Sequence, residues 1–318
     1  MKLRQLLQLL FGAATYVPGV HRLRGRATGG TQSARYCYAV WLRHLITAHT
    51  HGLLAKPPAV VAELGPGDSL GILLAALISG SNTGYAFDVV RFANDTRNID
   101  IFDQLVTLFR QREAIPGDEE FPKVRPRLES YEFPSGILPP DHLDRALDQQ
   151  RLESLRNALL NLGEENDPTA SITYVVPWHD AGLLDEAQVD MVYSQAVLEH
   201  VDDLPMTYAA CRRWLKPGGV MSHLIDFKSH GYARRWNGHW AYSDIRWKLI
   251  RGKKPYLLNR QPHSRHVELL AECNFELVCD MTVRDDTGIK REELTAALKG
   301  ASDDDLVTSI ALMQARKK

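Results

Sequence analysis

The stretch that decides the fold is ELGPGDSLG, residues 63–71. It follows the apolar run AVVAEL at residues 59–64, and such a run is typical of a strand buried on both faces of a parallel sheet. Glycine adopts backbone angles closed to other residues and allows a ligand to approach the chain closely. Asp68 and Ser69 are candidate caps for a helix predicted from Leu70 to Ser79. The stretch therefore predicts a strand, a tight glycine turn and a helix.

The segments on either side of this turn continue the alternation of strands and helices, which predicts a doubly wound, mainly parallel sheet. A helix is expected from Ser33 to about His51, ahead of the first strand. Six further strands are expected, at residues 84–90, 172–176, 189–194, 220–227, 275–283 and 306–315. Further helices are expected at residues 101–112, 141–162, 204–215 and 264–273. The fold class is thus α/β and Rossmann-like, with seven strands.

Two long segments interrupt this alternation. Residues 114–171 are rich in proline and charge, and residues 228–260 carry three tryptophans. Connections in α/β folds are usually short, so both segments are predicted to be insertions that form a cap or lid. The domain boundaries expected are an N-terminal helical segment at 1–55, which begins with a short amphipathic helix, and one catalytic domain at 56–318.

Asp88 lies at the end of the second predicted strand, roughly twenty residues after the glycine turn, where an acidic side chain can accept hydrogen bonds from both ribose hydroxyls of a nucleoside. The turn and Asp88 together predict a nucleoside-binding crevice. A dinucleotide would place its pyrophosphate at the start of the first helix, where Glu63 and Asp68 would repel it. S-adenosylmethionine instead brings an ammonium and a sulfonium, which carboxylates attract.

Four motifs in order resemble class I S-adenosylmethionine-dependent methyltransferases: AELGPG at 62–67, Asp88, DMVYSQAVLEHV at 190–201 and LKPGGV at 215–220. The resemblance spans about half the chain and implies S-adenosylmethionine as cofactor. It implies that Glu63, Gly65 and Gly67 line the methionine end of the cofactor, that Asp88 binds the ribose, and that Ser194 and Gln195 lie beside the sulfonium. Asp180 is the nearest match to an acidic residue that family members often place near the adenine.

His200 and Asp226 are the candidate catalytic residues, because ligands in this fold sit at the carboxyl ends of the strands. An Asp–His pair there would hold the imidazole in the tautomer that takes a proton from a hydroxyl acceptor. The alternative is that His200 only packs under the cofactor loop and Asp226 only caps a loop. His223, Asp226 and His230 imitate a metal-binding set, but strand alternation puts His223 and Asp226 on opposite faces. No metal is predicted.

The aromatic cluster Trp236, His239, Trp240 and Tyr242 has two interpretations. It is either a lid over a sugar or planar acceptor, or a satellite core under the second insertion. The run Asp303-Asp304-Asp305 is expected to cap the turn before the last strand without a ligand.

The composition indicates which kinds of partner and which cellular compartment are to be expected. A net charge of −1 gives no basic surface for nucleic acid. Four scattered cysteines indicate a cytoplasmic protein without disulfides, and no apolar stretch is long enough to cross a bilayer. A homodimer is compatible with the sequence, which does not set the oligomeric state.

The expected function is O-methylation of a small polar molecule or saccharide, although nothing in the sequence excludes N-methylation. Two alternatives stay open: an NAD-dependent oxidoreductase, and a catalytically idle regulatory protein that has kept the cofactor crevice.

Overall fold

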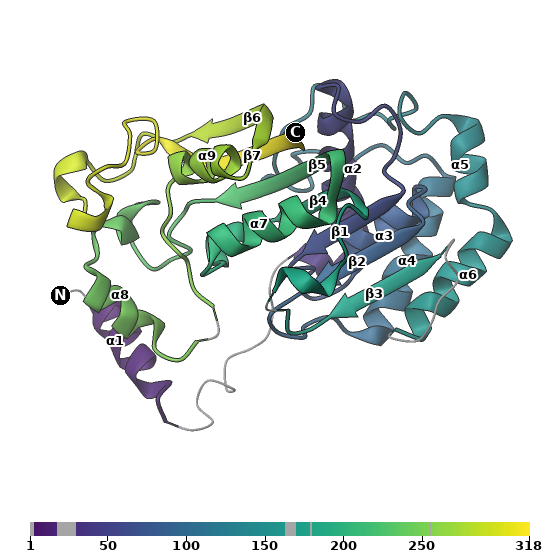
Figure 1. Cartoon of the computed structure of the whole chain (residues 1–318). Coiled ribbons are helices and arrows are strands. Elements are labelled where there is room, and N and C mark those ends of the chain that lie inside the picture. Colours follow the sequence, from purple (N-terminus) through teal and green to yellow (C-terminus); the bar gives the residue numbers. More distant parts are fainter. Residues whose placement is uncertain (1–2, 18–29, 163–169, 179, 255) are drawn as a thin grey trace.

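The computed structural model describes residues 3–17, 30–162, 170–178, 180–254 and 256–318. Its centre is a seven-stranded sheet in the order β3-β2-β1-β4-β5-β7-β6 (Figure 1). The first five strands in that order run parallel, and β7 is antiparallel to both β5 and β6. The strands are β1 (Val60–Leu64), β2 (Thr83–Phe87), β3 (Ser171–Val175), β4 (Val189–Gln195), β5 (Leu215–Asp226), β6 (Phe275–Arg284) and β7 (Thr308–Lys317). The predicted α/β fold with a mainly parallel sheet is confirmed.

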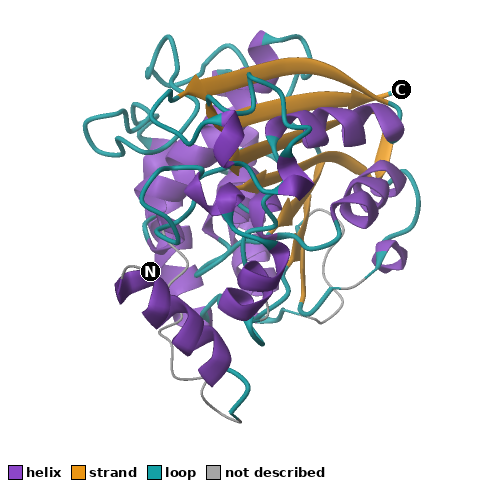
Figure 2. Cartoon of the chain, turned by 90° about the vertical axis from the view of Figure 1, so that its left-hand side faces the viewer, coloured by secondary structure: helices purple, strands orange, loops and turns teal. Residues whose placement is uncertain are grey.

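Helices cover both faces of this sheet (Figure 2). One face packs against α2 (Ala34–Thr50), α3 (Gly71–Ile78), α4 (Asp95–Arg110) and α6 (Gln149–Leu160). The other packs against α7 (Leu204–Trp214) and α9 (His263–Glu272). Within β1, Val61 contributes to the first core and Ala62 to the second, as expected for a strand whose successive side chains point to opposite faces. Among the described residues, none of the helices has the length and apolar character needed to cross a membrane.

Two predicted helices have different bounds in the structure, and side-chain caps explain both. Helix α4 begins six residues earlier than the predicted 101, because the Asn94 side chain accepts a hydrogen bond from the backbone N–H of Arg97. The helix predicted at 141–162 is two helices, α5 (Pro140–Ala146) and α6. Asp148 caps the second by accepting from the Arg151 N–H. These caps satisfy backbone donors that a helix start leaves unpaired.

The first insertion packs against the helical face of the sheet. The guanidinium of Arg43, which is fully buried on α2, donates to the carbonyl oxygens of Pro116 at 2.9 Å and Pro126 at 3.1 Å. The hydroxyl of Tyr38 donates to the Glu113 carbonyl at 2.7 Å, where the insertion begins. Because loop carbonyls satisfy a buried charged group, this segment is an integral part of the core around α2.

The second insertion lies beside the N-terminal helix. Helix α8 (Asp244–Arg251) packs against α1 (Leu3–Ala14) away from the sheet (Figure 1). The backbone N–H of Lys253, just after α8, donates to the Thr15 hydroxyl at 2.8 Å. The four residues of the aromatic cluster are all buried, and the Trp236 indole donates to the Asp285 carbonyl at 3.0 Å. The cluster is therefore a packed core, and the lid interpretation is wrong.

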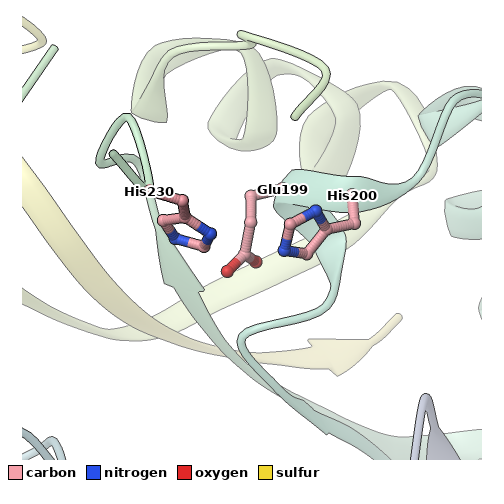
Figure 3. Close-up of side chains that lie close together, drawn as sticks. All are labelled: Glu199, His200 and His230. Atoms are coloured by element: carbon pink, nitrogen blue, oxygen red, sulfur yellow. The ribbon is translucent and has the colours of Figure 1, made fainter. Parts of the chain in front are cut away.

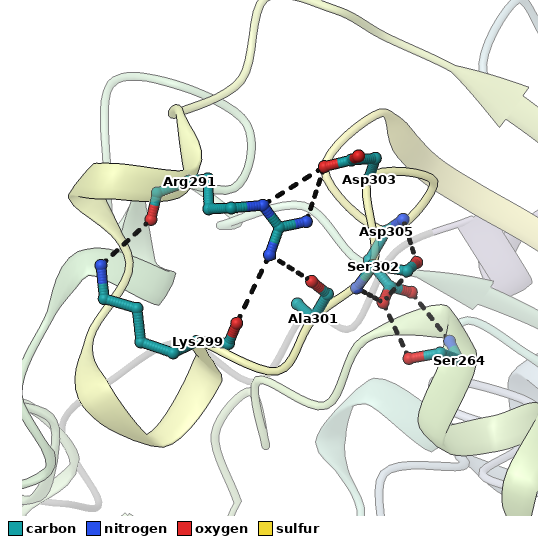
Figure 4. Close-up of polar contacts among 7 residues, drawn as sticks. All are labelled: Ser264, Arg291, Lys299, Ala301, Ser302, Asp303 and Asp305. Atoms are coloured by element: carbon teal, nitrogen blue, oxygen red, sulfur yellow. Dashed lines mark hydrogen bonds and ion pairs between the residues drawn. The ribbon is translucent and has the colours of Figure 1, made fainter.

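The acidic run before β7 has a structural role (Figure 4). Asp305 is 1% exposed and accepts hydrogen bonds from the backbone N–H and the hydroxyl of both Ser264 and Ser302. Asp303 pairs with Arg291 at 2.6 Å. Asp305 joins the start of α9 to the loop before β7, and Asp303 ties the same loop to Arg291.

Gly71 sets how closely α3 approaches α2. A Cβ at this position would lie 2.4 Å from the Sγ of Cys37 on α2, and both residues are buried. A methyl group there would force the two helices apart in a packed core.

We expect Gly71→Ala to lower the free energy of unfolding by about 1–3 kcal/mol, as overpacking does. Urea unfolding followed by circular dichroism measures this. Gly300→Ala is the matched control, because a Cβ at that glycine would meet nothing within 4 Å. Combining Gly71→Ala with Cys37→Ala should restore part of the loss, and equal unfolding midpoints for Gly71→Ala and the wild type would contradict the packing argument.

Candidate functional site

A cavity of about 540 Å³ opens at the carboxyl ends of the parallel strands. Its walls come from the turn after β1, residues 87–89 at the end of β2, Trp178 after β3, and residues 195–197 and 200–203 at the end of β4. Two further walls come from Gly30, Thr31 and Tyr36 near the start of α2, and from Tyr256 in the second insertion. This is the edge where α/β folds bind their ligands.

The glycine turn forms the floor of the cavity. Gly65 and Gly67 both have positive φ angles, +65° and +75°, which other residues rarely adopt. A Cβ at Gly65 would lie 2.6 Å from a methyl group of Val197, which follows β4. The turn therefore brings bare backbone to the cavity wall, and both glycines line the cavity as predicted.

Asp88 lies in the same cavity with its side chain fixed by the backbone. The residue is 7% exposed, and its Oδ1 accepts hydrogen bonds from the N–H groups of Val89 at 2.7 Å and Val90 at 3.4 Å. The backbone N–H of Gly67 also interacts with this carboxylate. Burial raises the pKa of Asp88, and these backbone donors oppose that rise. The carboxylate is thus held at the cavity wall, where it can meet a ribose.

Of the two residues expected beside the sulfonium, only Gln195 faces the cavity. Its Oε1 lies 3.2 Å from His44 Nε2, and His44 Nδ1 lies 2.6 Å from the Ser222 hydroxyl. Burial lowers the pKa of His44 to about 4, so the ring is neutral at pH 7. Oε1 is an acceptor, so Nε2 carries the proton of this ring. The Gln195 amide group is then left to donate toward Tyr36, with which it interacts.

Ser194 does not take the predicted place. It is fully buried, its hydroxyl lies 2.8 Å from His223 Nδ1, and it is outside the described cavity lining. Successive residues of β4 alternate between the faces of the sheet, which separates Ser194 from Gln195. The same contact keeps His223 in the core, away from Asp226.

Glu63 also lies beneath the cavity wall rather than in it. Its carboxyl is 1% exposed, receives the backbone N–H of Leu73, and lies 3.5 Å from the Tyr193 hydroxyl. Burial raises the pKa of Glu63 to about 8, so the group is mainly neutral at pH 7. The prediction that it lines the methionine end and repels a pyrophosphate by its charge does not match this position.

His200 lines the cavity, but the side-chain contacts of Asp226 go to Lys228, whose Nζ lies 3.7 Å from Oδ1, and to another histidine. Asp226 Oδ2 lies 3.5 Å from His230 Nε2, and the His230 ring is 5.2 Å from the His200 ring, centroid to centroid. Burial lowers the pKa of His200 to about 4. The predicted pairing of Asp226 with His200 is therefore replaced by a pairing with His230. Asp180, considered for the adenine, caps a short turn by accepting from the Gly182 N–H at 2.6 Å.

Several residues of the site were not identified from the sequence. Tyr36 and Tyr256 line the cavity from segments far from the glycine turn, and no short motif marks them. Glu199 also lies against His200, beside His230 (Figure 3). The dipeptide Glu199-His200 after β4 was the available signal for Glu199, whereas the sequence pattern linked His230 only with His223 and Asp226.

The predicted cap over the cavity is wrong for the first insertion. No described residue of 114–171 lines the cavity, and the described lining takes only Tyr256 from residues 228–260. The first insertion satisfies buried donors of α2 instead, and its Phe121 packs edge-on against Tyr36, which itself lines the cavity. The start of α2 supplies the outer wall that the insertion was expected to provide.

Comparisons with known proteins agree with this site. The family described as "Methyltransferase domain" matches residues 153–222, a range that includes β4, Gln195 and His200. No curated protein matches the chain in sequence.

Solved structures of similar fold were also found. One is assigned as a sarcosine dimethylglycine methyltransferase from Galdieria sulphuraria, with 14% identity, a TM-score of 0.45, and coverage of 86% of this chain and 84% of that one. An S-adenosylmethionine-dependent methyltransferase from Mesorhizobium loti has 14% identity, a TM-score of 0.40, and coverage of 85% and 96%. Geranyl diphosphate C-methyltransferase from Streptomyces coelicolor A3(2) has 12% identity, a TM-score of 0.42, and coverage of 86% and 74%.

The family match covers residues 153–222, and the glycine turn and the acidic end of the second strand, which lie outside that range, meet in the same cavity. The match supports methyl transfer from S-adenosylmethionine as the activity of this chain. Gly65, Gly67, Asp88 and Gln195 are the predicted cofactor residues that line the cavity.

The buried Glu63 predicts a pH dependence of stability. The unfolded chain releases this proton near its ordinary pKa of 4.5, whereas the folded protein keeps it up to about pH 8. Ionisation therefore favours the unfolded state, and the contribution of Glu63 to stability falls as the pH rises from about 4.5 to 8.

Glu63→Gln removes this titration. We expect the melting temperature of the variant, relative to the wild type, to rise between pH 5 and pH 8, as measured by differential scanning calorimetry. Glu276→Gln, at an exposed position on β6, should leave the pH profile unchanged. Parallel pH profiles for Glu63→Gln and the wild type would show that Glu63 is ionised in the folded protein.

Proposed function

We propose that this methyltransferase transfers the methyl group to an oxygen of a small polar molecule or saccharide bound at the His200 end of the cavity. The observation that carries the proposal is the cavity itself. Its volume of about 540 Å³ is typical of small-molecule sites, and its walls combine the glycine turn and Asp88 with aromatic and hydroxyl side chains from outside the sheet.

The charge of the cavity supports a cationic cofactor. Among the described lining residues none is lysine or arginine, whereas Asp88, Asp202 and Asp203 are included. Asp202 is paired with Arg251, but the described lining itself offers a pyrophosphate no lysine or arginine side chain, which speaks against the oxidoreductase alternative. The sulfonium and ammonium of S-adenosylmethionine suit such walls. The negative charge comes from these aspartates rather than from Glu63.

The residues at the other end suit a hydroxyl acceptor. His200 is neutral at pH 7, because burial lowers its pKa to about 4, and a neutral imidazole can accept a proton. Methyl transfer forms the oxygen–carbon bond as the sulfur–carbon bond breaks, and the hydroxyl proton passes to His200. The protein's main contribution is to hold the acceptor in line with the methyl group. Asp226 does not contact His200 directly in this proposal; it contacts His230, whose ring lies against the His200 ring.

We expect Asp88→Asn to weaken binding of S-adenosylhomocysteine by roughly ten- to a hundredfold, the loss expected for a hydrogen bond to a charged group. Asparagine keeps an oxygen for the Val89 and Val90 N–H groups, so the turn is retained while an acceptor for the ribose is lost. Isothermal titration calorimetry measures the change. Asp180→Asn is the matched control, because Asp180 also accepts from a backbone N–H but does not line the cavity.

Equal affinities for Asp88→Asn and the wild type would contradict the assigned ribose contact, and binding of NAD in place of S-adenosylhomocysteine would revive the oxidoreductase alternative. The acceptor is tested separately, by following formation of S-adenosylhomocysteine with panels of hydroxyl and amine compounds. Turnover with small hydroxyl compounds supports the proposal. Transfer to tRNA or to a protein, or to amines alone, would refute the proposed hydroxyl acceptor.

A further inference from the structure

Three ligand-type side chains converge at the edge of the cavity. Glu199 and His200 come from the short 3₁₀ helix Leu198–His200 after β4, and His230 follows β5. One ligand atom from each lies within 4.8 Å of the other two. Figure 3 shows the Glu199 carboxylate between the two imidazole rings.

The carboxylate of Glu199 is the unexplained group of this cluster. The residue is 3% exposed, and neither of its oxygens has a hydrogen-bond partner of good geometry, although nearby backbone N–H groups of Glu199 and Asp226 polarise it. Burial, and then the charge of Asp226, raise its pKa. A buried carboxyl group without a partner is costly, and a bound cation is one way to compensate it.

The rings of His200 and His230 flank the Glu199 carboxylate (Figure 3). Nδ1 of His200 is buried without a hydrogen-bond partner. Asp226, whose Oδ2 lies 3.5 Å from His230 Nε2, stands behind the second ring. A carboxylate behind a ligating imidazole is the common outer partner that fixes the orientation of the ring.

We propose that Glu199, His200 and His230 bind a divalent transition-metal ion, with Asp226 orienting His230. Two imidazoles and one carboxylate favour zinc, manganese or iron over magnesium and calcium, which prefer oxygen ligands alone. Ligands about 2.0–2.2 Å from one ion lie at most about 4.4 Å apart. The three atoms, all within 4.8 Å of one another, thus lie at about the spacing that a single ion requires.

The position of the ion suggests a role in methyl transfer. This role rests on the proposed function. His200 lines the cavity, so an ion held there would lie at the acceptor's end of it. Such an ion would lower the pKa of an acceptor hydroxyl bound to it, and the proton would pass to water rather than to His200, whose ring would be a ligand. The acceptor class becomes a hydroxyl compound able to coordinate a metal.

Metal binding is tested without substrate. Protein freed of metal with a chelator is titrated with zinc and with manganese chloride by isothermal titration calorimetry. We expect one ion per chain with a micromolar or lower Kd for at least one of the two metals. Glu199→Gln and His230→Gln should each weaken binding at least about tenfold. His263→Gln is the matched control, because His263 also pairs with a carboxylate, Asp280 at 3.0 Å, without a third ligand, and it should bind like the wild type.

Binding of S-adenosylhomocysteine separates the two proposals. Glu199→Gln and His230→Gln should retain it, which shows that they fold and that the cofactor site is intact, whereas Asp88→Asn should lose it and keep the metal. Absence of metal binding in the wild type, or equal metal affinity in wild type and Glu199→Gln, would overturn the metal site. Metal binding that depends on Glu199, in a protein that binds no S-adenosylhomocysteine, would uphold the metal site and refute the proposed function.

Discussion

The chain from β1 into α3 passes so close to two neighbouring segments that the residues at the two contact points can carry no side chain. Gly65 lies against Val197 of the loop after β4, and Gly71 lies against Cys37 of α2. The first contact brings the carboxyl ends of β1 and β4 together at the cavity floor. The second places α2 close enough for Tyr36, one residue before Cys37, to reach the cavity wall. The shape of the site thus depends on how closely bare backbone can approach its neighbours.

Burial decides which of the ionisable groups around the cavity carry charge. Glu63, His44 and His200 are all shifted toward their neutral forms, with pKa values of about 8, 4 and 4. A neutral imidazole accepts a hydrogen bond at one nitrogen and donates one at the other, as His44 does between Ser222 and Gln195. Burial raises the pKa of Asp88 as well, but backbone N–H groups of Gly67, Val89 and Val90 oppose that rise. Negative charge in the cavity therefore depends on backbone donors that stabilise the carboxylate where a cationic cofactor would meet it.

Local patterns predicted the sheet well, because each strand carries its own apolar signature and each turn its glycine or cap. Gly65, Gly67 and Asp88 were predictable for the same reason: their roles follow from backbone geometry at the end of one strand. Ser194 was misplaced because a single position decides which face of β4 a side chain takes. Tyr36 and Tyr256 could not be foreseen, since their contacts with the cavity come from packing between distant segments. The first insertion was misplaced because its main partner is Arg43, a buried charge that requires carbonyls from a loop.

Glu199 is the residue that the fold alone does not explain. A carboxyl group at the end of β4 could have turned to solvent, as the neighbouring Asp202 and Asp203 do in part. Instead it points inward between two imidazoles, one of which is held by a further carboxylate. Fold stability would favour an apolar side chain at such a position. The arrangement is therefore better explained by what the site binds than by what the core needs, and it lies where the cavity offers an acceptor its nearest polar groups.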